Sequence, residues 1–118
     1  MDHSYLIKNP TWGSEDASWK MVRVKKVLEV NGIKPTSICE VGCGSGAGLA
    51  SLRGIYPDAH LVGYDIAPDA EKFWEKYVDQ NIVFHLADFV KAEPAFYDTL
   101  LLLDVLEHIA DPHSFLLA

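Results

Sequence analysis

The stretch that decides the fold is E-V-G-C-G-S-G, residues 40–46, which has a glycine at every second position: Gly42, Gly44 and Gly46. It overlaps the end of a short apolar run over residues 38–41 and precedes apolar residues at helical spacing over residues 49–55. Glycines leave no side chains in such a turn, so the backbone can bend tightly and present its amides to a ligand at a helix N-terminus. The stretch therefore predicts a ligand-binding turn between a strand and a helix.

Strand-like and helix-like segments alternate along the whole chain. Strands are predicted at residues 38–41, 60–64, 82–86 and 100–103, and helices at residues 14–32, 49–55 and 68–79. Apolar runs this short are typical of parallel strands that are covered on both faces. The alternation requires right-handed crossovers and gives one open parallel sheet. We therefore predict an α/β fold, a three-layer Rossmann-like parallel sheet.

Composition indicates one small globular domain. The 118 residues are 49% hydrophobic and 23% charged, and residues 1–13 are expected to form an irregular lead-in before the amphipathic helix at 14–32. Seventeen acidic against ten basic residues give a net charge of -7, and no basic cluster suits nucleic acid. Cys39 and Cys43 fit neither a zinc spacing nor a disulfide scaffold, and no apolar run is long enough to span a bilayer. We expect a cytoplasmic protein without a membrane partner.

Acidic residues follow the second and third predicted strands. In an open parallel sheet, ligands bind outside the carboxyl ends of the strands. Asp65 stands nineteen residues after Gly46, where its carboxylate can accept hydrogen bonds from the hydroxyls of an adenosine ribose; alternatively, it caps the next helix. Asp88 can accept a hydrogen bond from an exocyclic amine, with Phe89 as an apolar neighbour for a base. These residues predict a nucleoside site at one edge of the sheet.

Over residues 36–113 the sequence resembles the class I S-adenosylmethionine-dependent methyltransferases, in particular the group that includes the ubiquinone and menaquinone biosynthesis enzymes. The stretches that match the family's motifs are S-I-C-E-V-G-C-G-S-G, L-V-G-Y-D-I, H-L-A-D-F and Y-D-T-L-L-L-L-D-V-L-E-H-I-A-D-P. The resemblance implies S-adenosylmethionine as the cofactor and methyl transfer to a small-molecule acceptor as the activity. The last stretch is the most discriminating of these matches.

The resemblance also implies which residues contact the cofactor. In chain order these are Glu40, Gly42, Gly44, Gly46, Asp65, Ile66, Asp88, Phe89, Leu103 and Asp104. The glycines would surround the methionyl part, and Glu40 would organise its amino end. Asp65 would hold the ribose and Ile66 would pack on the adenine. The adenine edge would meet Asp88 and Phe89, while a backbone carbonyl near the end of the fourth strand would face the methionyl ammonium.

The family's strand order is 3-2-1-4, and its members continue with further strands. The chain is therefore expected to be the N-terminal, cofactor-binding portion of one methyltransferase domain, without the C-terminal strands. Its fourth strand would then be an exposed apolar edge through which the chain self-associates. Two other interpretations remain open: a cofactor-binding module or truncated domain without activity, and an NAD-dependent oxidoreductase. The oxidoreductase is possible because residues 42–47 also satisfy the dinucleotide-binding pattern G-x-G-x-x-A.

The helix expected after the fourth strand carries Asp104, Glu107 and His108 at spacings that share one face. A similar pattern binds a divalent ion in some related O-methyltransferases, whereas in many relatives the same positions only brace the turn. We expect no metal. His108 is the expected general base, because the usual pKa of an imidazole, about 6.5, suits removal of a proton from an acceptor hydroxyl or amine.

Overall fold

The computed structural model describes residues 17–92 and 95–103. Its helices, strands and 3-10 turns (η) are, in chain order, α2 Ala17–Val30, β1 Ser37–Val41, α3 Ala47–Ile55, β2 His60–Asp65, η2 Pro68–Ala70, α4 Glu71–Trp74, η3 Glu75–Gln80, β3 Ile82–Leu86, η4 Phe89–Lys91 and β4 Thr99–Leu101. All four predicted strands and the three predicted helical segments are present. Positions 1–13 and the first residues of the helix expected at 14–32 lie outside the described residues.

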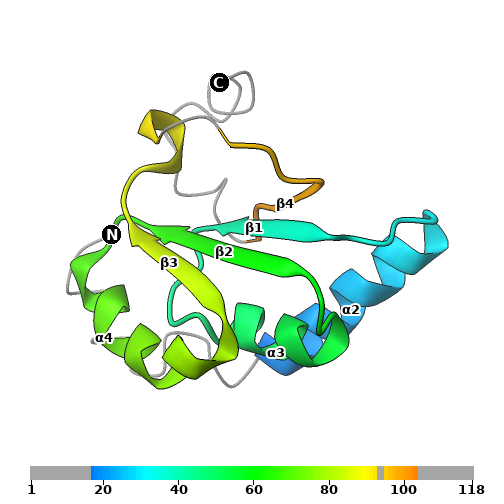
Figure 1. Ribbon diagram of the computed structural model, residues 1–118, viewed down its shortest axis with the longest axis horizontal. Helices are drawn as coiled ribbons and strands as arrows, with labels where there is room; N and C mark the ends of the chain where they lie inside the picture. Colours follow the sequence, from blue (N-terminus) through cyan, green and yellow to red (C-terminus); the bar gives the residue numbers. More distant parts are fainter. Residues whose placement is uncertain (1–16, 93–94, 104–118) are drawn as a thin grey trace.

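The four strands form one parallel sheet in the order β3-β2-β1-β4 (Figure 1). Cys39 of β1 lies opposite Val62 of β2 on one side and Leu100 of β4 on the other, and Val62 lies opposite Val83 of β3. This arrangement confirms the predicted α/β fold and the strand order. Among the described residues β4 has a neighbouring strand only on its β1 side. Self-association through its other edge stays a prediction.

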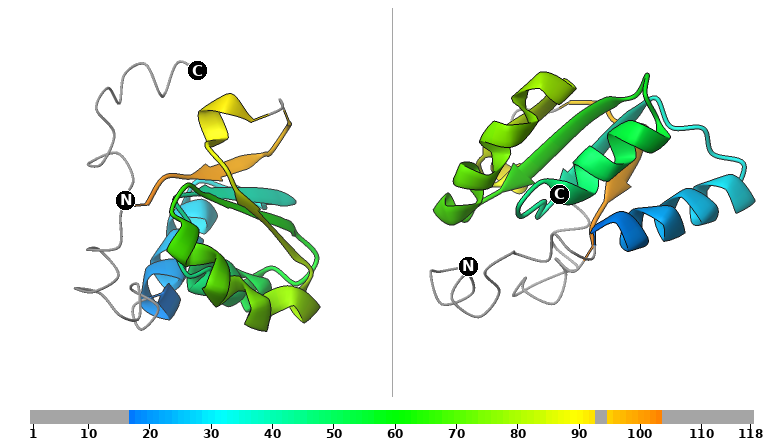
Figure 2. Two further views of the ribbon diagram at one scale, coloured as in Figure 1. Left: turned by 90° about the vertical axis from the view of Figure 1, so that its left-hand side faces the viewer. Right: turned by 90° about the horizontal axis from the view of Figure 1, so that it is seen from below.

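The direction of each crossover decides which face of the sheet a helix covers. The chain steps from β1 to β2 to β3 in one direction, and right-handed crossovers place α3 and α4 on the same face, where α2 also lies. The step from β3 to β4 runs back across the sheet, so η4 lies on the opposite face (Figure 2). Within the described ranges, this second face carries η4 and loop in place of a full helical layer.

Two predicted segments differ from the observed ones. Residues 68–79 were expected to form one helix, but they form a single α-helical turn, α4, between two 3-10 helices. Over so few turns, apolar residues three or four apart suit either type of helix. The fourth strand was expected at 100–103, but its pairing with β1 covers only Thr99–Leu101. A run of leucines does not show at which residue the pairing of β4 with β1 ends.

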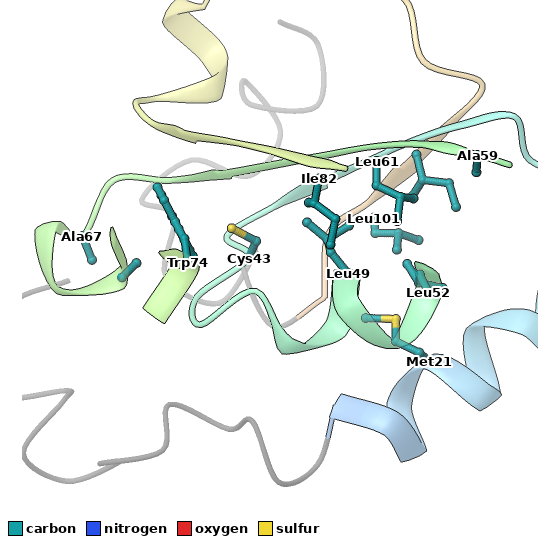
Figure 3. Packing of buried hydrophobic residues seen from close by; sticks show 12 residues of the cluster. Met21, Cys43, Leu49, Leu52, Ala59, Leu61, Ala67, Trp74, Ile82 and Leu101 are labelled. Carbon is teal, nitrogen blue, oxygen red and sulfur yellow. The ribbon is translucent and has the colours of Figure 1, made fainter. Parts of the chain in front are cut away.

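Apolar side chains fill both sides of the sheet. The larger cluster lies between the sheet and the three helices, and Met21, Ile38, Leu49, Leu52 and Leu61 are fully buried in it (Figure 3). The smaller cluster lies on the other face and contains Cys39, Val41, Val62 and Tyr64. Alternate residues of β1 and β2 thus enter opposite clusters, as the period of a strand requires. This burial explains why both strands are rich in apolar residues.

Two polar groups fix the amino ends of the strands. The guanidinium of Arg53 in α3 donates hydrogen bonds to five backbone carbonyls that precede β2 and β3, those of Tyr56, Pro57, Ala59, Gln80 and Asn81. The carboxylate of Asp98 accepts hydrogen bonds from the backbone N–H and the hydroxyl of Thr36, at 2.6 and 2.7 Å, and so links the starts of β4 and β1.

Among the described residues, no helix has both the length and the hydrophobicity that a membrane span needs.

Candidate cofactor-binding site

The turn between β1 and α3 has the backbone that its glycines predict. The φ angles of Gly42, Gly44 and Gly46 are 76°, 54° and 84°, in the left-handed region that glycine adopts without strain. The N–H groups of Gly42 and Cys43 both donate to the carbonyl of Tyr64, which anchors the turn on β2. We call residues 42–46 the glycine loop.

Asp65, at the end of β2, is bonded directly to this loop. One carboxylate oxygen accepts the backbone N–H of Gly44 at 2.8 Å, and the other accepts the N–H of Ala67 at 2.9 Å. The side chain is only 3% exposed. The bond to Ala67 forms a local turn before η2, so the capping alternative is correct in part. The bond to Gly44 crosses between two strand ends and could not be read from the spacing.

Two aromatic rings form the floor of the glycine loop. Trp74 of α4 and Phe84 of β3 stack with ring centroids 4.9 Å apart and planes 11° apart. A Cβ atom at Gly46 would lie 2.8 Å from the Phe84 ring, closer than real Cβ contacts allow. The indole N–H of Trp74 donates to the carbonyl of Gly44 at 2.9 Å. The sequence did not predict this bond, because the helical spacing of Trp74 carries no signal of it.

Glu40 is a buried carboxylate in the centre of the sheet. It lies on β1 between Gly63 of β2 and Leu101 of β4, and is 6% exposed. A Cβ atom at Gly48 would lie 3.3 Å from its Oε1, so the carboxylate lies beside the first turn of α3. The positive end of a helix dipole stabilises a negative charge there. Its expected role at the amino end of the cofactor stays a prediction.

The remaining described candidates differ in what they contact. Ile66 is 60% exposed, although it directly follows the buried Asp65. Asp88 accepts the backbone N–H of Val90 at 3.0 Å and so caps η4. Phe89 packs edge-on against Tyr64, with centroids 5.3 Å apart, and belongs to the cluster on the far face of the sheet. The adenine contacts expected of Asp88 and Phe89 stay predictions.

Leu103 is the last described residue, and it packs against the larger core cluster. Asp104, Glu107 and His108 lie outside the described residues, and so does the helix on which they were expected. Among the residues that are described, no group of three or more His, Cys, Asp or Glu side chains could hold a metal ion. The general-base role of His108 therefore stays a prediction.

Both cysteines are buried and free. Burial, with a smaller contribution from the charge of Glu40, raises the pKa of the Cys39 thiol to about 12. Burial first, and then the charges of Glu40 and Asp65, also raise the pKa of Cys43 well above its usual value. Protonated, buried thiols are poor nucleophiles, so both cysteines have a packing role.

The parallel sheet, the left-handed glycine loop after β1 and the carboxylate at the end of β2 together define a Rossmann-like cofactor-binding domain. A family model described as "Methyltransferase domain" matches residues 19–118. The chain belongs to this family of methyltransferase domains. The family match favours a methyltransferase over the oxidoreductase that shares the glycine spacing.

Curated relatives are similar over different shares of the chain. The ubiquinone biosynthesis O-methyltransferase of Glaesserella parasuis is 25% identical over 121 residues, which cover 88% of this chain and 50% of the relative. The malonyl-(acyl-carrier protein) O-methyltransferase of Anoxybacillus flavithermus is 40% identical over 60 residues, which cover 50% of this chain and 23% of the relative. The chain thus spans half or less of the length of these relatives.

Solved structures share the fold. The plantazolicin methyltransferase BpumL, in complex with a triazolic desmethylPZN analog and S-adenosylhomocysteine, matches with a TM-score of 0.73 and 20% identity over 97% of this chain and 44% of its own. Human N-acetylserotonin methyltransferase, in complex with S-adenosylmethionine, matches with a TM-score of 0.58 and 25% identity over 88% of this chain and 33% of its own. The compounds in these structures agree with the cofactor that was expected.

Proposed function

We propose that this chain is the cofactor-binding part of an S-adenosylmethionine-dependent methyltransferase that acts on a small-molecule acceptor, and that it belongs with the ubiquinone and menaquinone biosynthesis enzymes. The observation that carries the proposal is the bond between Asp65 and Gly44, which joins the carboxylate expected to bind ribose to the loop expected to bind the methionyl part. The 25% identity to the Glaesserella parasuis enzyme supports the narrower group.

The residues at the carboxyl ends of β1 and β2 fit a nucleoside with an amino-acid tail. Each carboxylate oxygen of Asp65 has one backbone donor, and its second lone pair can accept a ribose hydroxyl without releasing the loop. The exposed side chain of Ile66 offers an apolar surface to a purine ring. The glycine loop lets a ligand approach the backbone, because no side chain projects from positions 42, 44 and 46.

S-adenosylmethionine carries the methyl group on a sulfonium. When the methyl group is transferred, the sulfur leaves readily as a neutral thioether. The contribution of the protein is then mainly alignment of donor and acceptor. In this proposal Asp65 holds the ribose, the glycine loop surrounds the methionyl part with Glu40 at its amino end, and a carbonyl of Leu103 or Asp104 faces its ammonium. Asp88 and Phe89 contact the adenine edge. His108 takes the proton when the acceptor is a hydroxyl or an amine.

Calorimetry tests the cofactor. We expect S-adenosylhomocysteine to bind the 118-residue chain at one site, and NAD titrated in parallel to give no heat of binding. A response to NAD alone would replace the proposal with the oxidoreductase.

Activity is tested separately, by methyl transfer with this chain and with a longer chain that carries the C-terminal strands of the family. Transfer by the longer chain only would identify the 118 residues as a binding module without activity. Undiminished turnover after His108→Ala in the active chain would remove the general base.

A further inference from the structure

Gly44 is held from both sides by side chains of other elements. Its N–H is bonded to Asp65, and its carbonyl accepts the indole N–H of Trp74, 30 residues away, at 2.9 Å. The bond is buried, and Trp74 is 7% exposed. Figure 3 shows Trp74 extending from α4 toward the sheet, beside Cys43, the chain neighbour of Gly44. The central residue of the glycine loop therefore depends on a helix that contributes none of the expected cofactor contacts.

The indole ring is fixed in place, so the direction of its N–H is fixed too. It stacks on Phe84 of β3, and a Cβ atom at Gly46 would lie 3.4 Å from its Cδ1 atom. The ring thus lies between α4, β3 and the glycine loop. Rotation of the indole away from Gly44 would break the stack and open a space beneath the loop.

The bond to Trp74 also orients the next peptide group. A trans peptide is planar and its C=O and N–H point in opposite directions. Because the carbonyl of Gly44 points at the indole, the N–H of Ser45 points away from the aromatic floor. The preceding peptide is set in the same manner, since its N–H points at Asp65 and its carbonyl, on Cys43, accepts the N–H of Gly46.

We propose that Trp74 is a positioning residue of the cofactor site: its indole N–H holds the peptide after Gly44 in the orientation that lets the glycine loop accept the cofactor. The inference rests on the proposed function. Packing alone would be satisfied by any large apolar ring, whereas this role needs the N–H. Phenylalanine at position 74 retains an aromatic ring to stack on Phe84, but it removes the donor together with part of the indole's volume.

The affinity of the 118-residue chain for S-adenosylhomocysteine, measured by calorimetry, tests the donor. We expect Trp74→Phe to weaken binding by about 3- to 10-fold, the effect of one net hydrogen bond. Trp19→Phe is the matched control, because Trp19 is 62% exposed on α2, and its affinity should be unchanged. Arg53→Lys is the control for stability. It weakens the amino-end edge of the sheet, so it should lower the melting temperature without lowering affinity below that temperature.

A spectroscopic signal tests the same bond in the unaltered chain. With 15N-labelled tryptophan, the indole resonance of Trp74 is assigned by its loss in Trp74→Phe, or by elimination after Trp19→Phe and Trp12→Phe. Saturation with S-adenosylhomocysteine should shift this resonance and leave that of Trp19 in place, because a bound ligand polarises the peptide that accepts the bond. A Trp74 resonance that does not move at saturation would show that the bond to Gly44 does not respond to the ligand.

The outcomes separate the two proposals. No binding by the unaltered chain would overturn the proposed function and this inference with it. Full affinity in Trp74→Phe, an equal loss of affinity in Arg53→Lys, or an unmoved Trp74 resonance at saturation would each overturn the inference and leave the proposed function intact. If Trp74→Phe does not fold, the resonance in the unaltered chain decides.

Discussion

The carboxylate of Asp65 and the backbone N–H of Gly44 meet at 2.8 Å, although 21 residues separate them in the chain. The bond joins the ends of two neighbouring strands. It makes one side chain responsible both for the shape of the loop and for the ligand that the loop is proposed to hold. Replacing Asp65 should therefore affect stability and binding together.

We predict that Asp65→Ala lowers the free energy of unfolding by roughly 2 to 4 kcal/mol, because two buried backbone donors, on Gly44 and Ala67, lose their acceptor. Urea denaturation measures this change. Affinity for S-adenosylhomocysteine should fall more than tenfold under conditions where the variant remains folded. Asp65→Asn retains one acceptor oxygen, so its stability and affinity should lie between those of the unaltered chain and those of Asp65→Ala. An alanine variant with full affinity would remove Asp65 from the site.

Gly46→Ala should destabilise the chain by about 1 to 3 kcal/mol, because its φ of 84° disfavours a Cβ atom and that atom would lie 2.8 Å from the Phe84 ring. The matched control is Gly54→Ala in α3, where a Cβ atom meets nothing within 4 Å. Alanine favours a helix more than glycine, so this control should gain about 0.5 to 1 kcal/mol. Thermal unfolding of both variants measures the contrast, and equal effects would contradict it.

Arg53→Ala should lower the free energy of unfolding by roughly 2 to 3 kcal/mol. Five carbonyls before β2 and β3 lose a charged donor, and those near the surface regain water, so the losses do not add. Urea denaturation measures the loss. Lysine at this position supplies a charge without the planar fork of donors, so Arg53→Lys should recover only part of it. Full recovery by lysine would show that charge alone matters here.

We expect the chain to lose stability in acid because of Asp98. Burial tends to raise the pKa of its carboxyl, but hydrogen bonds from Thr36, Thr99 and Ser37 outweigh burial and lower the pKa below its usual value of 3.8. The unfolded chain then binds a proton more readily than the folded one, so stability from Asp98 is present above about pH 4 and is lost as the pH falls through the lowered pKa. Asp98→Asn should remove this component from the pH profile of unfolding.

The two thiols should be unreactive in the folded chain. Because their pKa values are raised, to about 12 for Cys39, almost no thiolate exists near pH 8, and both side chains are buried. We expect a disulfide reagent to label neither cysteine in buffer and both in concentrated urea. Rapid labelling of Cys43 in buffer would show that the glycine loop opens in solution, and Cys39→Ser assigns the signal.

Much of the fold follows from the sequence because burial on both faces makes β1 and β2 rich in apolar residues, and glycines mark the turn where φ is positive. The predicted strand ends then place Gly44 and Asp65 together at the carboxyl edge of the sheet. The bonds that define the site do not follow. Neither the Trp74 bond to Gly44 nor the stack on Phe84 leaves a periodic signal, since an indole donor and a core ring occupy the same helical positions. The 3-10 geometry around α4 is hidden because apolar residues three or four apart suit either type of helix over so few turns.

The parallel order β3-β2-β1-β4 also has a kinetic consequence. No two strands of this sheet are joined by a hairpin, so every pairing must close a long loop before it gains any hydrogen bonds. The pairing of Ile38 with Thr99 closes the longest of these loops. During synthesis, β1, β2 and the loop between them leave the ribosome well before β4 exists. The pairing of β1 with β4 should thus form last, after β1, β2 and the glycine loop have met, and folding should be slow compared with that of a helical bundle of this length.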